Sequence, residues 1–157
     1  MGHLIASIAE HHLADIAAIE ARLFDQPTTA SALAILFANP AFVGFVFSTD
    51  LPLRTGGAGY IFALNDGHDA DLVSIGTAPE FQRSGYGLLL LRYLAATLHE
   101  RGVETLMLEV AFDNMAAQSL YARAGFNEVA VRPRYYGRAH GAVDAVVMRL
   151  LTRHAVP

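Results

Sequence analysis

One stretch of the sequence, residues 71–136, constrains the fold more than any other, because strand and helix patterns alternate along it. A first strand pattern ends at a Gln82-x-x-Gly85-x-Gly87 turn, and a leucine-rich helix pattern follows over Leu88–Arg101. A second strand pattern, Val103–Ala111, leads to a second helix pattern, Met115–Ala124. This alternation predicts an α/β fold, with a mixed central sheet that carries helices on both faces.

The glycine turn before the first of these helices is a candidate anion site. Gly85 and Gly87 leave the backbone open to close approach. The first-turn amides of a helix have no intrahelical acceptor, so they can bind phosphate oxygens, and Gln82 and Arg83 add donors beside them. A purely steric role for the glycines also fits the turn. A Walker loop and a dinucleotide fingerprint do not, because the Lys-Ser/Thr and the third glycine are absent.

Glu109 is an unexpected residue in the second strand pattern. Its neighbours Leu108 and Val110 are typical of a buried strand. A carboxylate in such surroundings is unfavourable unless it is paired or used, and ligands of open α/β sheets gather at the carboxyl ends of strands. The alternative is an ordinary half-exposed carboxylate at a strand end.

Tyr121 lies near the end of the second helix pattern. Asp113 or Asn114 can cap the start of that helix, and Gly125 suits the left-handed position just past its end. A Schellman motif there packs Phe126 against Tyr121. Local evidence alone therefore predicts a core or half-core tyrosine.

Taken together, these residues resemble the GCN5-related N-acetyltransferase (GNAT) family, and within it the RimI-like ribosomal-protein-alanine acetyltransferases. About half of the chain carries the resemblance closely. The matching segments are Ile75-Gly76-Thr77-x-Pro79, Gln82-Arg83-Ser84-Gly85-Tyr86-Gly87, Leu108-Glu109-Val110, Asn114-x-x-Ala117, Leu120-Tyr121, Gly125-Phe126-Asn127-Glu128-Val129, Arg132-x-x-Tyr135-Tyr136 and Asp144-Ala145-x-x-Met148.

The resemblance implies acetyl-coenzyme A as the cosubstrate. The backbone of Ile75 to Thr77 would hold the pantetheine arm and the acetyl carbonyl, and the glycine turn would cradle the pyrophosphate. Glu109 would act as general base and Tyr121 as general acid. The cofactor-binding residues implied are Ile75, Gly76, Thr77, Arg83, Ser84, Gly85, Tyr86, Gly87, Leu88 and Asn114.

The same resemblance implies a protein or peptide N-terminus as the acceptor, with ribosomal proteins among the candidates and with Phe24, Tyr135 and Tyr136 as contacts. An α-ammonium has a pKa of about 7.7 to 8.0, against about 10.4 for lysine, so a carboxylate base can activate it readily. From the residues alone, Arg132 to Val143 is a hairpin loop between two strands. Two rival classes remain: a small-molecule amine acetyltransferase and a non-catalytic acetyl-coenzyme A sensor, which would not need both Glu109 and Tyr121.

The sequence departs from the branch at three places. Leu88 stands where the family has a basic residue, and Phe24-Asp25-Gln26-Pro27-Thr28 replaces an aromatic-rich segment. A turn rich in Pro, Gly and Thr is inserted at Asp50 to Gly57.

Composition narrows the class of protein. A chain of 157 residues favours one domain, residues 1–157, and 54% hydrophobic residues with 17% charged residues exclude disorder. Without cysteine there is no disulfide and no cysteine acyl-enzyme, so direct transfer is the simplest route. A net charge of -4 argues against nucleic acid, and the seven histidines show no metal-ligand spacing. We expect a cytoplasmic monomer or homodimer without a membrane span.

The remaining patterns complete the expected order of elements. The expected strands are His3–Ala9, Phe42–Phe47, Gly59–Leu64, Asp71–Thr77, Phe126–Arg132 and Asp144–Leu150, and the expected helices near the start are Leu13–Phe24 and Thr29–Phe37.

Overall fold

A computed structural model describes residues 4–49 and 57–155 of the chain. The strands are β1 (Leu4–Ser7), β2 (Phe42–Ser48), β3 (Gly59–Asn65), β4 (Asp69–Thr77), β5 (Thr105–Ala111), β6 (Asn127–Tyr136) and β7 (Val143–Leu151). The helices are α1 (Leu13–Leu23), α2 (Ala30–Ala38), α3 (Tyr86–Glu100) and α4 (Met115–Ala124), with short 3-10 turns at Glu10–His12, Pro79–Phe81 and Thr152–His154.

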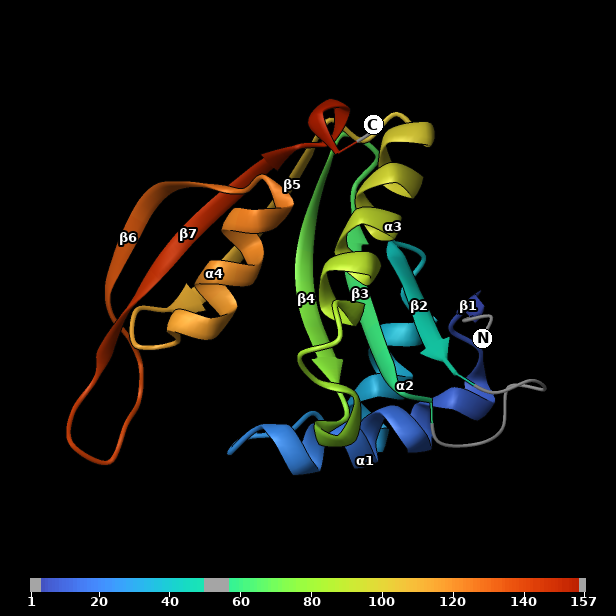
Figure 1. The fold of residues 1–157 in the computed structure, drawn as a ribbon, viewed down its shortest axis with the longest axis horizontal. Coiled ribbons are helices and arrows are strands. Elements are labelled where there is room, and N and C mark those ends of the chain that lie inside the picture. Colours follow the sequence, from blue (N-terminus) through green and yellow to red (C-terminus); the bar gives the residue numbers. More distant parts are fainter. Residues whose placement is uncertain (1–3, 50–56, 156–157) are drawn as a thin grey trace.

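The strands form one sheet in the order β1-β2-β3-β4-β5-β7-β6 (Figure 1). Neighbouring strands are antiparallel except β4 and β5, which are parallel. The expected mixed sheet with β4 at its centre is therefore confirmed. In the described residues, no helix is long and apolar enough to cross a membrane.

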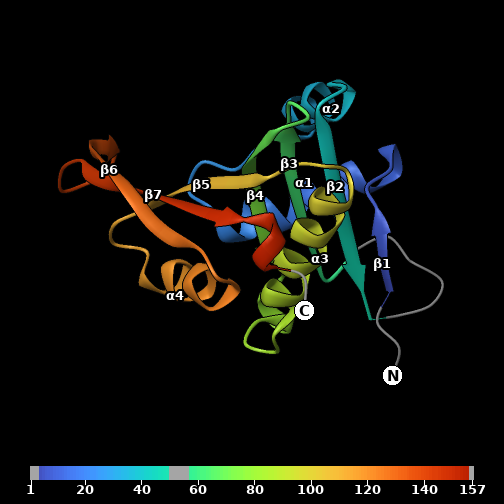
Figure 2. The same ribbon diagram turned by 90° about the horizontal axis from the view of Figure 1, so that it is seen from above.

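Helices cover both faces of the sheet, as expected (Figure 2). The larger core joins α3 and α4 to one face, where Leu94 and Leu98 are fully buried. The smaller core joins α1 and α2 to the other face through Ile16 and Leu33. Since β2 and β3 lie between the two cores, nearly all their residues are buried, which explains their continuous apolar sequences.

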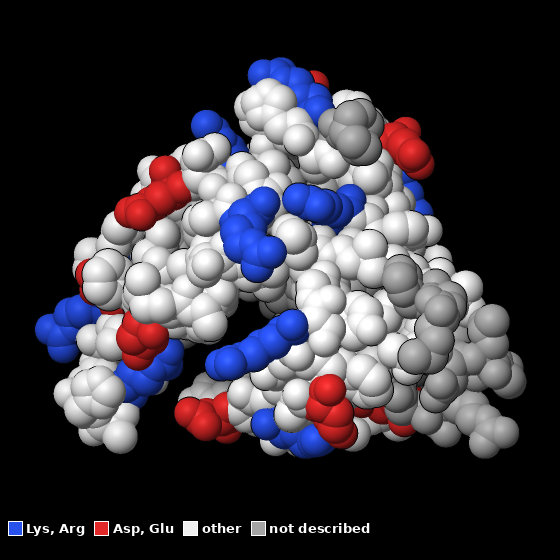
Figure 3. Space-filling view, viewed as in Figure 1, with Lys and Arg blue, Asp and Glu red and all other residues white. Residues whose placement is uncertain are grey.

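The pairing between β4 and β5 covers only part of each strand. It runs from Asp69 opposite Thr105 to Asp71 opposite Met107, and then the two strands separate. From Leu72 onward β4 stays paired with β3, while β5 stays paired with β7 through Ala111. The sheet therefore opens into two arms, and the space-filling view shows a hollow between them (Figure 3).

Several expected boundaries are wrong. The helix after the glycine turn begins at Tyr86 rather than Leu88, because Gly85, at φ 83°, turns the chain directly into the helix. The strand expected to end at Arg132 continues to Tyr136, so the first part of the expected 132–143 loop is strand. β1 ends at Ser7 rather than at Ala9, and His3, where it was expected to begin, lies outside the described residues. The expected 50–57 insertion also lies outside them except for Gly57.

Candidate active site

The glycine turn holds an open helix N-terminus beside the end of β4. Arg83 and Gly85 both have left-handed backbones, with φ of 61° and 83°. The first bond inside α3 runs from the Leu89 amide to the Gly85 carbonyl oxygen at 3.0 Å, and the Gln82 side-chain amide donates to the Thr77 carbonyl oxygen at 3.1 Å. Left-handed residues beside a helix start direct consecutive amides toward one point, as an anion requires.

The two glycines of this turn have different surroundings. A Cβ atom at Gly85 would meet nothing within 4 Å, so its backbone conformation is what requires glycine. A Cβ atom at Gly87 would lie 3.2 Å from Leu120 in α4, so this glycine also permits close packing of the two helices. Ser84 is exposed in the turn, while Leu88 is half-buried in the first turn of α3.

The last residues of β4 turn backbone groups toward the opening. The Ala78 amide donates to the Ala58 carbonyl oxygen at 2.8 Å, so Gly76, two residues earlier, also directs its groups to β3. The groups of Ile75 and Thr77 therefore point away from β3, toward the side where β5 has separated. Gly76 itself is required by packing, because a Cβ atom there would lie 2.6 Å from the Tyr60 ring.

Glu109 opens onto a groove of about 470 Å³ on the side of the sheet away from α3. Its side chain is 25% exposed, and its Oε1 lies 3.0 Å from Nε of Arg132. An ion pair with an arginine orients a carboxylate. The groove is lined by Asp71, Leu72, Val73, Met107, Leu108, Glu109, Arg132, Tyr135, Tyr136 and Val147.

An irregularity in β6 directs Tyr135 and Tyr136 into the groove. The β6–β7 register shifts between Arg132 and Tyr136, and the Arg134 amide donates to the Asp144 carboxylate at 2.9 Å within this bulge. The two tyrosine rings meet edge to face with centroids 5.0 Å apart. The adjacent Glu109 carboxylate raises the pKa of Tyr135 above its ordinary value.

Tyr121 occupies the position predicted from the helix-ending pattern. The Phe126 amide donates to the Tyr121 carbonyl oxygen at 3.0 Å, and the Gly125 amide to that of Ala122 at 3.1 Å, which is a Schellman motif. The rings of Tyr121 and Phe126 pack with centroids 5.8 Å apart. The side chain is 8% exposed. Burial, with a contribution from Tyr136, raises the pKa of Tyr121 to about 12.

Asn114, rather than Asp113, caps α4: its side-chain oxygen accepts from the Ala117 amide at 3.1 Å. This leaves its side-chain NH₂ group as the donor available to a ligand. Asp113 instead pairs with Arg138 of the β6–β7 hairpin through two bonds of 3.0 Å. Arg138 thereby holds the pKa of the Asp113 carboxyl below its usual range.

Phe24 is the one expected contact that the structure does not place in the groove. It ends α1 and is 41% exposed, but it is not among the groove-lining residues. The segment after it follows the left end of α1, which lies across the opening from the β6–β7 hairpin in Figure 1. The Asp113 carboxylate, and to a smaller extent the charge of Asp25 in this segment, raises the pKa of Arg138 in the hairpin.

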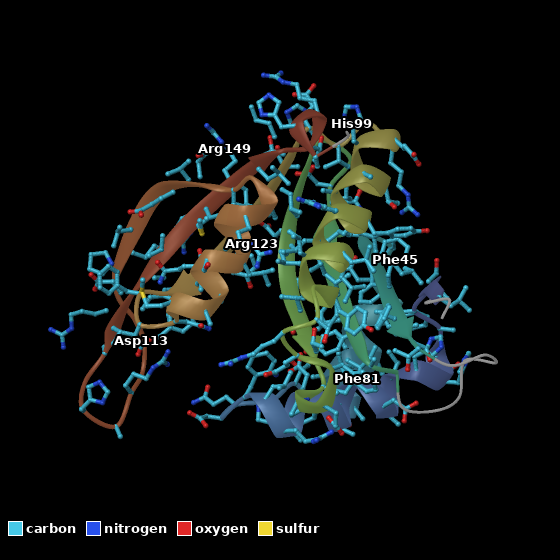
Figure 4. The ribbon with its side chains drawn as sticks, viewed as in Figure 1. Phe45, Phe81, His99, Asp113, Arg123 and Arg149 are labelled. Carbon is cyan, nitrogen blue, oxygen red and sulfur yellow. The ribbon has the colours of Figure 1, made fainter. Side chains whose placement is uncertain are left out.

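Two functional candidates were missed from the sequence. Arg132 was noted only as part of a motif, and nothing local indicated that it reaches Glu109. Asp71 adds a second carboxylate to the groove, and its only signal was its place before the β4 apolar run. Positive side chains border the hollow in Figure 3, and Figure 4 labels Arg123 on α4, beside the space between the arms.

Comparison with known proteins identifies the family. The sequence model of the Acetyltransferase (GNAT) family matches residues 6–126. This chain belongs to that family. The match runs from β1 to just past the end of α4, and so includes the glycine turn, Glu109 and Tyr121, while β6 and β7 lie beyond it.

Individual GNAT relatives agree with this assignment. The chain is 48% identical to the [ribosomal protein bS18]-alanine N-acetyltransferase of Salmonella typhimurium over 82 residues, which are 52% of this chain and 55% of that protein. It thus spans about half the length of the curated relatives it matches. The crystal structure of the ribosomal-protein-S18-alanine N-acetyltransferase from Escherichia coli superposes with a TM-score of 0.88 and 31% identity, covering 96% of this chain and 94% of the other.

A chimeric spermidine N-acetyltransferase from Vibrio cholerae shares the fold, with a TM-score of 0.83, 21% identity and 99% of each chain covered. The GNAT fold therefore serves proteins named for different acceptors. The acceptor has to be argued from the groove rather than from the fold.

Proposed function

We propose that this protein transfers the acetyl group of acetyl-coenzyme A directly to an amine, and that the amine is the N-terminus of a protein. The observation that carries the proposal is the groove: it presents the Glu109 carboxylate at the opening between β4 and β5, with the end of β4 beside it. A nucleophile on one side and a thioester on the other can meet at this opening. The relatives named for acetylation of ribosomal protein bS18 support the choice of acceptor, and such a role fits a cytoplasmic location.

The donor side would be formed by α3, α4 and the end of β4. The amides from Arg83 to Leu88 suit the pyrophosphate, because the glycine turn opens the helix N-terminus. The gap-facing groups of Ile75 and Thr77 suit the pantetheine arm. The side-chain oxygen of Asn114 caps α4, so its NH₂ group is available to donate a hydrogen bond to the cosubstrate. These residues fit a long, anionic, amide-bearing donor such as acetyl-coenzyme A.

The chemistry follows from the charges in the groove. Glu109 accepts a proton from the acceptor ammonium, and the free amine then attacks the thioester carbonyl carbon. The amides of Ile75 or Thr77 stabilise the resulting oxyanion. The nitrogen loses its second proton to solvent as the carbon–sulfur bond breaks and the amide product forms. Tyr121 gives a proton to the departing thiolate and is reprotonated from solvent, and Glu109 then releases its proton to solvent, so one proton is released overall. With a pKa of about 12, Tyr121 is protonated at neutral pH and can serve as that acid.

The acceptor proposal depends on the tyrosines. Tyr135 and Tyr136 line the groove beside Glu109 and can hold a peptide backbone by hydrogen bonds. The second candidate is a small-molecule polyamine, because Asp71 and Glu109 place two carboxylates in one groove. Arg132 neutralises one of them, which favours an acceptor with a single positive charge at the reacting end.

A competition assay distinguishes these acceptors. The protein is incubated with acetyl-coenzyme A and an equal mixture of three acceptors, and the products are read by mass spectrometry. The acceptors are a lysine-free peptide with a free N-terminus, a matched peptide with a blocked N-terminus and one lysine, and spermidine. The chain itself contains no lysine, so lysine self-acetylation cannot obscure the result. We expect the free N-terminus to react first. Faster acetylation of spermidine would establish the small-molecule class, and donor binding without any transfer would establish a sensor.

A further inference from the structure

Glu20 is a buried carboxylate that the catalytic scheme does not use. It lies in α1 with 2% of its surface exposed. Its oxygens accept three hydrogen bonds: from the Tyr60 hydroxyl at 2.7 Å, the Ser74 hydroxyl at 2.6 Å and the Thr28 amide at 2.7 Å. Donors of this kind offset the cost of burying the polar oxygens of a carboxyl group. No ion pair to Glu20 occurs in the part of the chain that the structure describes.

One oxygen of Glu20 is bonded to the sheet. Tyr60 and Ser74 lie on β3 and β4, both donate to Oε1, and their hydroxyls are 3.0 Å apart. Burial raises the pKa of Tyr60 and the Glu20 carboxylate adds to this rise, so the phenol stays protonated and donates. Tyr60 also packs across Gly76. This oxygen is therefore fixed to the stretch of β4 that borders the opening.

The other oxygen of Glu20 is bonded to a connection without regular structure. Oε2 accepts from the Thr28 amide, and the connection runs from the end of α1 at Leu23 to the cap of α2 at Thr29. After the larger effect of Asp113, the negative charge of Asp25 in this connection adds to the raised pKa of Arg138 in the β6–β7 hairpin. In Figure 1 the left end of α1 and this hairpin stand on opposite sides of the opening between the arms.

We propose that Glu20 is a positioning residue for the acceptor: its carboxylate ties the Phe24 to Thr28 segment to β4 and so sets the width of the acceptor entrance. The inference rests on the proposed function, since it assumes an amine acceptor that enters between this segment and the β6–β7 hairpin. Glu20 acts through Thr28 and does not touch the acceptor.

The chemistry of the three donors supplies a graded set of variants. In Glu20→Ala the Thr28 amide loses its acceptor, so the segment is released. In Glu20→Gln the side-chain oxygen can still accept from Thr28, while its NH₂ group faces two hydroxyls that can accept as well as donate. Ser74→Ala is the matched control, because it removes one bond to the carboxylate and leaves the bond to Thr28 in place.

The measurements are the KM for an acceptor peptide, kcat, and the Kd for acetyl-coenzyme A by calorimetry. We expect Glu20→Ala to raise the peptide KM about tenfold or more while the donor Kd stays within about twofold. Glu20→Gln should restore the KM to within about threefold of wild type, and Ser74→Ala should leave it unchanged. Equal effects of Glu20→Ala and Ser74→Ala on the KM would overturn the proposal, because the sheet contact rather than the tether would then matter.

Amide hydrogen exchange tests the tether without turnover. In the wild-type protein the Thr28 amide should exchange slowly, and Glu20→Gln should retain much of this protection. Fast exchange at Thr28 in the wild type would refute the tether even if Glu20→Ala fails to fold. A wild-type protein that binds acetyl-coenzyme A and acetylates no amine would refute the proposed function instead, while leaving the exchange result to decide the tether.

Discussion

Glu109 and Arg132 show how single residues limit the chemistry. Their ion pair at 3.0 Å puts a cation where the proposed mechanism needs the acceptor ammonium. The Arg132 guanidinium and the acceptor ammonium are both positive and bind the same carboxylate. The acceptor must therefore displace Arg132 or share Glu109 with it. Arg132 is largely exposed, with 58% of its side chain accessible, so moving it breaks this ion pair and a cation–π contact with the Tyr135 ring at 5.7 Å.

Replacing Glu109 with glutamine should lower turnover by about 10²-fold, because the amide cannot accept the ammonium proton. The deficit should shrink as the pH rises past the pKa of the acceptor amine, which then loses its proton to solvent. Steady-state kinetics at several pH values measure this, with the Kd of acetyl-coenzyme A as control. Wild-type turnover in Glu109→Gln, with normal donor binding, would show that Glu109 is not the base.

Tyr121 leads to a prediction about the alkaline side of the pH profile. A phenol donates a proton only while protonated, and the pKa of Tyr121 is raised from 10 to about 12. The protonated range therefore extends upward, so kcat should stay level to about pH 10.5 instead of falling near pH 10. Tyr121→Phe keeps the ring beside Phe126 and should lower kcat at every pH in this range. A decline of kcat centred well below pH 10 would contradict the assignment.

At the scale of elements, patterns that depend on neighbours in sequence could be predicted. The Schellman motif at Gly125 and the capped start of α4 follow from local residue types. The true start of α3 was missed, because a left-handed Gly85 allows the helix to begin sooner than the apolar pattern indicates. The length of β6 was missed because the bulge at Arg134 depends on Asp144 in the next strand.

The glycine turn provides a test of donor binding. Arg83→Asn removes the cation and keeps a residue that tolerates the left-handed backbone at φ 61°. We expect acetyl-coenzyme A to bind about three- to tenfold more weakly, with a smaller dependence on salt, since a phosphate contact is lost. Calorimetric titration at two salt concentrations measures both effects.

Arg134→Asn is the matched control, because Arg134 is also exposed and left-handed, at φ 54°, but lies on β6. Its donor affinity should equal that of the wild type. Equal weakening in both variants would mean that net charge, rather than the turn, governs donor binding.

At the scale of the whole molecule, the site exists because β4 and β5 separate after Asp71 and Met107. The helix-capped donor side and the groove lie on opposite faces of the sheet and meet only at this opening. Sequence patterns could not predict the separation, since it depends on β4 following β3 while β5 follows β7. The ion pair between Glu109 and Arg132 and the network around Glu20 were missed for the same reason: their partners are distant in sequence.

Because the donor side and the acceptor groove lie on opposite faces of the sheet, we expect variants on one face to change the binding of one substrate only. Tyr135→Phe keeps the ring against Tyr136 and removes the hydroxyl beside Glu109. We expect it to raise the peptide KM severalfold and leave the Kd of acetyl-coenzyme A unchanged, the reverse of Arg83→Asn. Because the two residues lie on different sides of the opening and share no partner within residues 4–49 and 57–155, the double variant should lose kcat/KM by the product of the single losses, within about twofold. A clear departure from that product would mean that donor and acceptor binding are coupled through the opening, and that the two arms move together when either substrate binds.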